Sequence, residues 1–542
     1  MATQKERFDP ITLELLWTRL ISATDEAAAA LVRTSFSTLV RESYDFSCIV
    51  TDESGQSLVQ ATQSIPSFIG TLPRTVKHFL NEFPIDKLQP GDVLITNDMY
   101  QGSGHLPDIN LGKPLFYQGR MIGYAATTAH APDIGGKIRS PEPREVFEEG
   151  LQIPIMKMID AGKVNDTLVS IIRKNVRTPD QTMGDLWAQV VALDVMEART
   201  IALLKDAGLD NLCDLATEIH TRCEAVMRAA IRELPDGIYR SVLDIDGQLD
   251  APAHLEMALT VAGDTIDIDF AGTSPQVDRA INSAMCFTFA QTVYGVKCML
   301  APNLPNNEGS FRPITIRAPE GCIVNPVFPA SGGSRMLTGH FLGSMVLQAL
   351  GDVLPHRVMA SPGSPHWGIN QSGVKSGKPY ANMLFFSGGI GANNLRDGIS
   401  CLGWPGNTSS TPIELSERIA PFRIKYKRLR ADSGGPGEFR GGLGQEILFE
   451  NRSESPIAVS FLTEHILYPP LGIAGGRPAA CGILEINGKS AHAKRQHVIN
   501  KGDTILLATP GGGGLGDPKR RNPARVEEDL KQGYITDDAP YR

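Results

Sequence analysis

Hydrophobic positions near the start of the chain follow a helical period. Leu13, Leu16 and Leu20 recur after Asp9-Pro10, which can supply an N-cap and a proline at the first helical position, so a helix is predicted to run toward Arg33. Shorter apolar runs separated by turn residues follow. They predict a hairpin with strands at 46–50 and 58–61, a buried strand at 93–96, and a second hairpin with strands at 114–117 and 121–128.

The pattern becomes helical from about 160 to 235, with a long amphipathic run over 185–234. Strands are predicted at 239–245, 257–261 and 265–270, and helices at 290–300 and 341–350. The last third contains short strand patterns at 423–430, 445–450, 457–461 and 481–486. We therefore expect an α+β fold, multi-lobed and loop-rich, with mixed α/β elements and a β-rich C-terminal third. The expected divisions are an N-terminal lobe over 1–160, a helical segment over 161–235, a central α+β lobe over 236–420 and a β-rich lobe over 421–542.

Composition narrows the functional classes. The 542 residues leave room for a large core, and the formal net charge of −8 disfavours binding to nucleic acid or to an anionic membrane surface. The first ten residues lack the apolar centre of a signal peptide, and no apolar run reaches the roughly 20 residues that span a bilayer, so we expect a cytoplasmic protein. The eight cysteines are scattered without a Cys-x-x-Cys pair, which argues against a thiolate zinc site or a disulfide scaffold.

The segment 97–136 carries the clearest chemical signal. His-x-x-Asp occurs twice, as His105/Asp108 and as His130/Asp133. Each copy follows a predicted strand and is expected to lie in a loop with glycine or proline, where distant segments can meet. Imidazole and carboxylate ligands without cysteine suit a divalent cation such as zinc, manganese or iron, and they leave a coordination position for water or substrate. Asp45, just before the first hairpin, is a further candidate ligand.

These residues also allow other interpretations. A single His-x-x-Asp is common and usually only hydrogen-bonded, and an aspartate of either copy could orient a histidine instead of binding metal. Asp98 and Asp133 could act as a base or in that orienting role. The weaker candidates for contact with substrate or phosphate, for which a structural role is the simpler reading, are Glu148, Arg177, Arg335 and, as a pocket-lining loop residue, His366.

Two glycine-containing segments superficially resemble phosphate-binding loops. Gly488-Lys489-Ser490 lacks a glycine at the required spacing and is better interpreted as a hairpin turn. The run 511–514 lacks the Lys-Ser/Thr pair and fits either a tight backbone passage or the lining of a substrate or partner surface. We therefore predict that this chain has no ATP site of its own.

Ordered motifs run along nearly the whole chain. They include Gly104-His105-Leu106-Pro107-Asp108, the His130 copy through Gly136, and segments at 65–73, 90–93, 148–154, 175–177, 184–185, 269–276, 388–392, 433–437 and 511–517. Together these motifs resemble the hydantoinase B/oxoprolinase family. The resemblance implies metal ligands at His105, Asp108, His130 and Asp45. Many family members have histidine where this chain has Phe68, a departure that leaves the substrate unspecified.

The resemblance also implies a reaction that needs a second protein. A hydantoinase A-type subunit would bind ATP-Mg and phosphorylate the amide oxygen of a small cyclic amide: a hydantoin, oxoproline or a lactam. This chain would hold the activated ring at the divalent metal for hydrolysis, within an (αβ)2 heterotetramer. The alternatives are a subunit of an acetone-carboxylase-type carboxylase, since those enzymes are related, and a non-catalytic scaffold with a structural metal.

Overall fold

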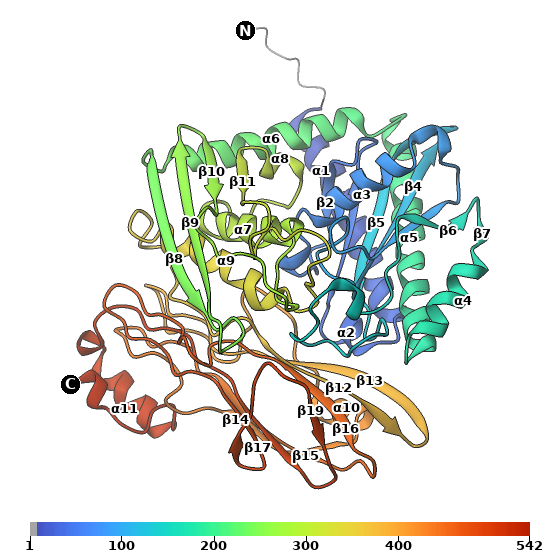
Figure 1. Cartoon of the computed structure of the whole chain (residues 1–542). Coiled ribbons are helices and arrows are strands. Elements are labelled where there is room, and N and C mark those ends of the chain that lie inside the picture. The colour runs from blue at the N-terminus through green and yellow to red at the C-terminus, as the bar shows by residue number, and fades with distance from the viewer. Residues whose placement is uncertain (1–7) are drawn as a thin grey trace.

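The computed structural model describes residues 8–542. A seven-stranded antiparallel sheet forms the centre of the N-terminal part, in the order β2-β1-β5-β4-β3-β6-β7 (Figure 1). Leucines of α1 (Pro10–Thr34) and α5 (Pro179–Ala207) cover one face, and α3 (Thr71–Glu82) covers the other. The strands are β1 (Phe46–Thr51), β2 (Ser57–Gln60), β3 (Val93–Thr96), β4 (Asp108–Tyr117), β5 (Arg120–His130), β6 (Met156–Asp160) and β7 (Lys163–Val164).

A second, four-stranded sheet in the order β11-β10-β9-β8 packs on buried helices in the middle of the chain. Helices α7 (Met285–Leu300) and α9 (Met336–Ala349) approach closely, because a Cβ at Gly295 would lie 2.9 Å from the Gly343 backbone. The remaining elements here are α6 (Cys213–Arg232), β8 (Gly237–Ile245), β9 (Ala253–Ala262), β10 (Thr265–Asp269), α8 (Glu308–Phe311) and β11 (Ile314–Arg317).

The C-terminal third is a sandwich of two sheets, in the orders β13-β12-β16-β19 and β14-β15-β20-β17-β18. Trp367, Phe449 and Phe461 belong to the apolar core that joins them. The strands are β12 (Trp367–Lys375), β13 (Lys378–Phe386), β14 (Phe422–Leu429), β15 (Gln445–Asn451), β16 (Ile457–Leu462), β17 (Ile483–Ile486), β18 (Lys489–Ser490), β19 (His497–Ile499) and β20 (Thr504–Ala508). The α+β class and the β-rich C-terminal third are thereby confirmed.

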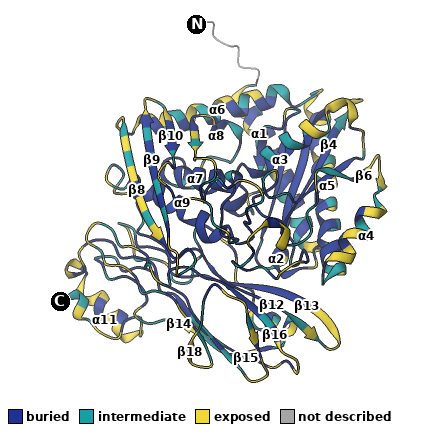
Figure 2. Ribbon diagram, viewed as in Figure 1, coloured by how far each residue is buried: buried dark blue, intermediate teal, exposed yellow. Residues whose placement is uncertain are grey.

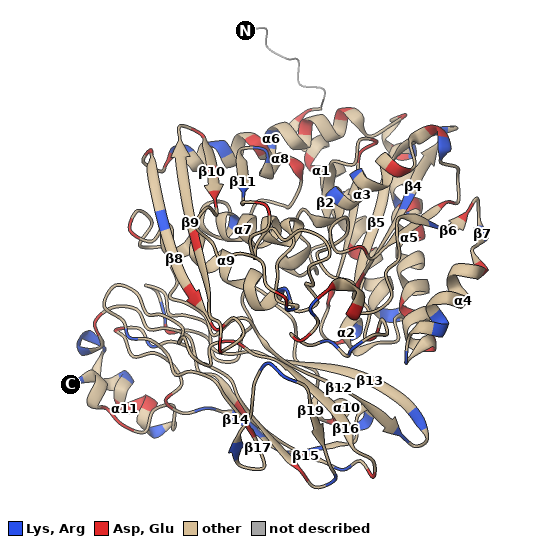
Figure 3. Cartoon of the chain, in the orientation of Figure 1, with Lys and Arg blue, Asp and Glu red and all other residues tan. Residues whose placement is uncertain are grey.

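Short elements connect these layers. They are α2 (Thr38–Arg41), η1 (Pro66–Phe68), η2 (Ile85–Lys87), η3 (Val146–Glu148), α4 (Asp166–Asn175), α10 (Ile413–Ile419), η4 (Pro518–Arg520), α11 (Pro523–Lys531) and η5 (Ala539–Tyr541). Burial is nearly continuous through β1, β4, β5 and the central helices α7 and α9, whereas the outer strands β8 and β14 and the outer helices carry many exposed residues (Figure 2). Charged residues of both signs are interspersed over these outer elements (Figure 3). Among the residues that the structure describes, no helix combines the length and apolar character needed to cross a bilayer.

The glycine run at 511–514 passes through the C-terminal part as tightly packed backbone. Its amides and carbonyls bond to neighbouring loops, for example Gly513 N to Ser361 O at 2.8 Å and Gly435 N to Gly512 O at 2.8 Å. A Cβ at Gly512 would lie 2.0 Å from the Ile390 carbonyl oxygen. The tight-passage interpretation is therefore confirmed, because only hydrogen fits at this position.

Three sequence-based expectations are corrected. The run 185–234 is two helices, because α5 ends at Gly208, whose φ of 64° is left-handed, and α6 begins at Cys213. The hairpin β12/β13 was not predicted. The His-x-x-Asp copies do not lie wholly in loops: Asp108 is the first residue of β4 and His130 is the last of β5, because both strands extend further than their apolar residues indicate.

Candidate metal centre

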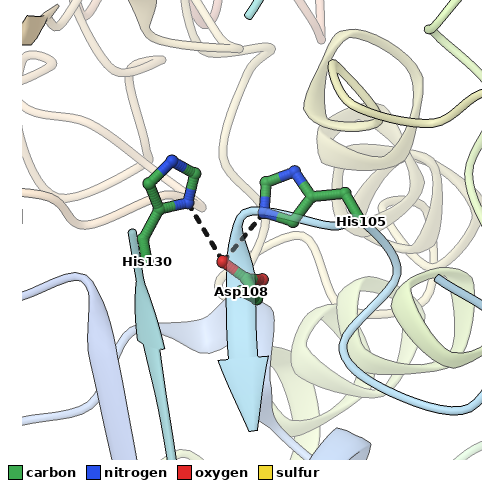
Figure 4. A group of neighbouring side chains, drawn as sticks. All are labelled: His105, Asp108 and His130. Carbon is green, nitrogen blue, oxygen red and sulfur yellow. Dashed lines mark hydrogen bonds and ion pairs between the residues drawn. The ribbon is translucent and has the colours of Figure 1, made fainter. Parts of the chain in front are cut away.

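Three neighbouring inner strands, β1, β5 and β4, bring the candidate ligands together at one end of the strands of the seven-stranded sheet. In the register of β4 and β5, Asp108 pairs directly with His130, which places their side chains next to each other. Asp45 immediately precedes β1, and its carbonyl accepts the His130 amide at 3.1 Å. His105 lies in the loop before β4 and points toward the same carboxylate (Figure 4).

The buried ligand atoms converge. His105 Nε2 lies 2.8 Å from Asp108 Oδ1, and His130 Nδ1 lies 3.0 Å from the same oxygen. The candidate ligand atoms of these three residues lie within 4.8 Å of one another. Asp45 Oδ2 is 3.8 Å from His130 Nδ1, at the margin of the group. A divalent cation bound here would have two imidazoles and one or two carboxylates as ligands.

A cation can bind His105 only through a ring nitrogen that carries no proton, so the position of the proton on this imidazole matters. Its Nδ1 lies 3.0 Å from the carbonyl oxygen of Gly333, which can only accept, so Nδ1 carries the proton. Burial and Arg335 hold the pKa of His105 well below its ordinary value, which favours an imidazole that can bind a cation. Nε2 faces Asp108 Oδ1. A proton or a metal ion between these two atoms would balance their charges, and the convergence of three ligand residues suits a metal ion.

A guanidinium fixes the shared carboxylate. Arg335 Nη2 donates to Asp108 Oδ2 at 2.7 Å, and its guanidinium lies 4.1 Å from the centre of the Phe287 ring. Burial disfavours the charge of Asp108, but His105 and Arg335 outweigh it and hold the pKa of this carboxyl well below its usual range. Asp108 is therefore ionised, with Oδ1 free to act as a ligand. Burial raises the pKa of Asp45, whose charge would gain most from a cation.

These groups line a cavity with about 320 Å³ of empty space. His340 of α9 and His366, just before β12, lie on its wall with ring centres 5.4 Å apart. Among the described residues, neither Nδ1 atom has a hydrogen-bond partner. Burial lowers the pKa of both imidazoles, that of His366 to about 3, so both are neutral. The cavity thus presents two neutral imidazoles beside the candidate metal ligands.

Comparison with known proteins places the chain in a family. The model of the hydantoinase B/oxoprolinase family matches residues 9–518. The chain belongs to the hydantoinase B/oxoprolinase family. Caprolactamase subunit beta of Pseudomonas jessenii is 31% identical to it, with 98% of this chain and 94% of that subunit covered.

Solved structures agree with this assignment. The crystal structure of the ATP-dependent caprolactamase from Pseudomonas jessenii is 28% identical, with a TM-score of 0.91 over 98% of this chain and 95% of that chain. A nucleotide-free acetone carboxylase has the same fold, with a TM-score of 0.90, 20% identity, and coverage of 98% of this chain and 79% of that chain. The hydantoinase B/oxoprolinase fold therefore extends over nearly all of this sequence.

The remaining site candidates from the sequence fall into two groups. Arg335 and His366 line the cavity with the candidate ligands, whereas Asp98, Asp133 and Glu148 do not. Asp98 accepts from the amides of Tyr100 and Gln101 in its own turn, at 2.8 and 2.9 Å. Asp133 pairs with Arg177 Nη1 at 2.6 Å and lines a neighbouring pocket. Glu148 is exposed and accepts from the Arg144 amide at 3.2 Å. Phe68 is buried but does not line the cavity.

Sequence reasoning missed three further residues around the centre: Arg139, Glu149 and His340. Arg139 lines both the metal cavity and the neighbouring pocket, and its Nε donates to Gly333 O at 2.8 Å. Glu149 is buried and accepts from the amides of Gly332 and Gly333. All three depend on contacts between distant segments. The adjacent glycines at 332 and 333, where a side chain would collide with Met99 or crowd Glu149, were the available signal.

Proposed function

We propose that this chain is the metal-binding subunit of an ATP-dependent hydrolase that opens small cyclic amides. The observation that best supports this proposal is the buried group of His105, Asp108 and His130, in which one nitrogen of each imidazole lies within 3.0 Å of the same carboxylate oxygen. The full-length similarity to caprolactamase subunit beta supports the substrate class, which includes lactams, hydantoins and oxoproline.

An unstrained cyclic amide resists hydrolysis because resonance strengthens its C–N bond. In this proposal a partner of the hydantoinase A type binds ATP-Mg and transfers the γ-phosphoryl group to the amide oxygen, which makes the ring carbon an imidate-like electrophile. Water adds to that carbon, the ring nitrogen takes a proton as the C–N bond breaks, and hydrolysis of the resulting acyl phosphate releases the acid and inorganic phosphate. The name of the beta subunit of caprolactamase supports the need for a partner. The proposed assembly is an (αβ)2 heterotetramer.

The chain's own residues would hold and orient the reacting groups. His105, Asp108, His130 and Asp45 would bind zinc, manganese or iron, and a bound cation supplies a Lewis acid that polarises oxygen and lowers the pKa of water. Gly333 orients His105, and Arg335 keeps Asp108 charged. The neutral imidazoles of His340 and His366 line the same cavity and could each donate or accept one hydrogen bond.

Reconstitution tests this proposal. The purified chain, the ATP-binding partner and their mixture would be incubated with ATP-Mg and a panel of lactams, hydantoins and oxoproline. Phosphate release and ring-opened product would be measured. We expect ring opening and its coupled ATP hydrolysis only in the mixture, and loss of ring opening in a mixture containing His105→Ala. ATP hydrolysis and ring opening by this chain alone would contradict the proposal.

The same assay separates the alternatives. The acetone carboxylase likeness, at 20% identity, concerns the fold alone. A strict requirement for bicarbonate, with labelled carbon entering the product, would replace hydrolysis by carboxylation. Full ring-opening activity in assembled complexes that contain His105→Ala or His130→Ala would instead indicate that this subunit is a non-catalytic scaffold.

A further inference from the structure

A second pocket adjoins the metal cavity, and His130 and Arg139 line both spaces. This Arg139 pocket has about 570 Å³ of empty space, part of it open to solvent, and is bounded by Arg139, Glu149, Ile134, Asn370, Met383 and the loop after His130. Its walls combine apolar side chains with a few polar groups, as small-molecule sites do. The polar groups decide which ligand fits.

The guanidinium of Arg139 lacks oxygen partners for most of its N–H groups. Nε donates to Gly333 O at 2.8 Å, while Nη1 and Nη2 contact only the sulfur atoms of Met383 and Met336, at 3.3 and 3.5 Å. Thioether sulfur is a weak acceptor, and buried donors usually find strong ones. Among the described residues no carboxylate forms an ion pair with Arg139. Its outer edge is therefore suited to two oxygens of a ligand anion.

Arg139 supplies a positive charge that an anion would meet in this pocket. Burial and the neighbouring Arg335 lower the pKa of Arg139 to about 10, so Arg139 stays cationic at neutral pH. Arg335 is already paired with Asp108, which leaves Arg139 as the cation without a carboxylate partner on the wall between the two spaces. A phosphoryl group, with three acceptor oxygens and up to two charges, matches this edge better than a single carboxylate.

The pocket also offers unused acceptor and amide groups. Glu149 Oε1 accepts from the amides of Gly332 and Gly333, at 2.8 and 2.7 Å, and from Ser331, but its buried Oε2 has no partner among the described residues. Asn370 Nδ2 is likewise buried and unpaired, on β12 opposite Met383 of β13. A ligand with an N–H group beside its anion would match Glu149 and Arg139 together.

We propose that the Arg139 pocket binds the phosphorylated cyclic amide, with Arg139 holding the phosphoryl oxygens and Glu149 accepting the ring N–H. This inference rests on the proposed function, because it assumes that the amide oxygen is phosphorylated. Phosphorylation of that oxygen breaks no N–H bond, so the ring keeps its proton and its C–N unit gains a positive charge, and this N–H is a donor to Glu149. The pocket would hold the activated carbon next to His130 and the candidate metal ligands.

Phosphate binding to the metal-free, full-length chain tests the anion site without the partner. Calorimetric titrations with inorganic phosphate and with acetate would compare the wild-type chain with Arg139→Met and Arg139→Lys. Arg430→Met is a matched control, because Arg430 is also half-buried but donates to backbone carbonyls of Cys481 and Thr509. We expect Arg139→Met to weaken phosphate binding at least about 10-fold, Arg139→Lys to be intermediate, and Arg430→Met to match wild type.

Unchanged phosphate affinity in both Arg139 variants would overturn the assignment, as would acetate binding as tightly as phosphate. If Arg139→Met fails to fold, Arg139→Lys decides, because it keeps the charge but not the two-oxygen geometry. Circular dichroism and thermal melting would identify that case.

Coupling in the reconstituted complex supplies the second readout. A phosphorylated ring that is not captured is lost to water, so Arg139→Met should raise the ratio of ATP hydrolysed to ring opened several-fold, while Arg430→Met leaves it unchanged. Normal coupling in Arg139→Met would refute the inference and leave the proposed function intact. Phosphate binding through Arg139 in a complex that opens no ring would refute the proposed function and leave the anion site standing.

Discussion

At the scale of single residues, the positions of protons decide what the centre can bind. His105 is held by Gly333 so that its protonated nitrogen points away from the group, and Arg335 keeps Asp108 negative. His130 reaches the same carboxylate oxygen from the end of β5. These contacts prepare two imidazole nitrogens and a carboxylate oxygen for one cation.

Removing either imidazole should therefore remove the metal. We expect His105→Ala and His130→Ala each to lower the affinity for the divalent cation at least about 10-fold, since each deletes a direct ligand. Metal content after dialysis, measured by elemental analysis, checks this. His254→Ala is a matched control because His254 forms an exposed pair with Asp244 at 2.8 Å. Wild-type metal content in both cavity variants would remove the centre from the proposal.

The neutral histidines should make the metal-free chain sensitive to acid. His366 has a pKa of about 3 in the folded chain against 6.5 for an exposed histidine, so below about pH 6.5 the unfolded chain takes up a proton that the folded chain does not. Stability is then present at neutral pH and is lost as pH falls from about 6.5 toward 3, by at most about 1.4 kcal/mol per pH unit for this group. Urea unfolding at about pH 7 and about pH 5 should show a smaller loss for His366→Phe than for wild type. Equal losses would contradict this account.

The sequence identified residues whose chemistry is visible locally or in family motifs. The His-x-x-Asp spacing and the resemblance to the family selected the residues that converge at the centre. Arg139 and Glu149 could not be found in this way, because their partner, Gly333, lies more than 180 positions further along the chain. A half-buried guanidinium without a carboxylate partner is a property of tertiary packing and leaves no spacing pattern in the sequence.

At the scale of elements, the register of β4 and β5 determines the centre. Successive residues of a strand point to opposite faces, so the direct pairing of Asp108 with His130 fixes both on the same side. Apolar periodicity predicted the cores of these strands but not their ends. The polar ligands occupy those last positions, where no alternation of hydrophobic residues remains to mark the strand.

The β12/β13 hairpin shows a signal that was present but not used. Ser376 and Gly377 separate the strands, with φ values of 52° and 77°, as a two-residue hairpin turn requires. The flanking residues mix glycine, asparagine and glutamine with apolar residues, so the strand pattern is weak. These polar residues lie on the hairpin that lines the Arg139 pocket.

The glycine passage should tolerate no side chain. We expect Gly512→Ala to destabilise the chain by about 3 kcal/mol or more, or to prevent soluble expression, because the added carbon meets backbone on the Ile390 side at 2.0 Å. Gly237→Ala is the control, since its added carbon would make only ordinary contacts with Tyr239, the closest at 3.7 Å, and we expect a change within about 0.5 kcal/mol. Denaturant unfolding measures both. Similar stabilities for the two variants would show that the passage can relax.

At the scale of the whole molecule, the centre joins parts that are far apart in sequence. The candidate ligands belong to the seven-stranded sheet, Arg335 and His340 to the start of α9, and His366 to the C-terminal sandwich. Ser460 of β16 also donates to the Arg139 carbonyl at 2.6 Å. The cavity at the centre is therefore lined by residues from all three parts.

Metal binding should therefore stabilise the chain as a whole. We expect removal of the cation with a chelator to lower the melting temperature by roughly 2–5 °C, because a ligand that binds only the folded state adds its binding free energy to folding. Calorimetry of wild type before and after chelation measures the shift. His130→Ala should show no chelator effect. Unchanged melting of metal-loaded wild type would mean that the centre is uncoupled from global folding.

The carbonyl of Gly333 accepts from both His105 and Arg139, and its amide is held by Glu149. This acceptor belongs to the main chain, so no replacement of a side chain can delete it. A rotation of the peptide plane between Gly333 and Ser334, which carries this carbonyl, would disturb the imidazole and the guanidinium together. Glu149 holds the preceding peptide plane through the amide of Gly333, so a ligand that bound its unpaired oxygen would act on His105 through the backbone of Gly333.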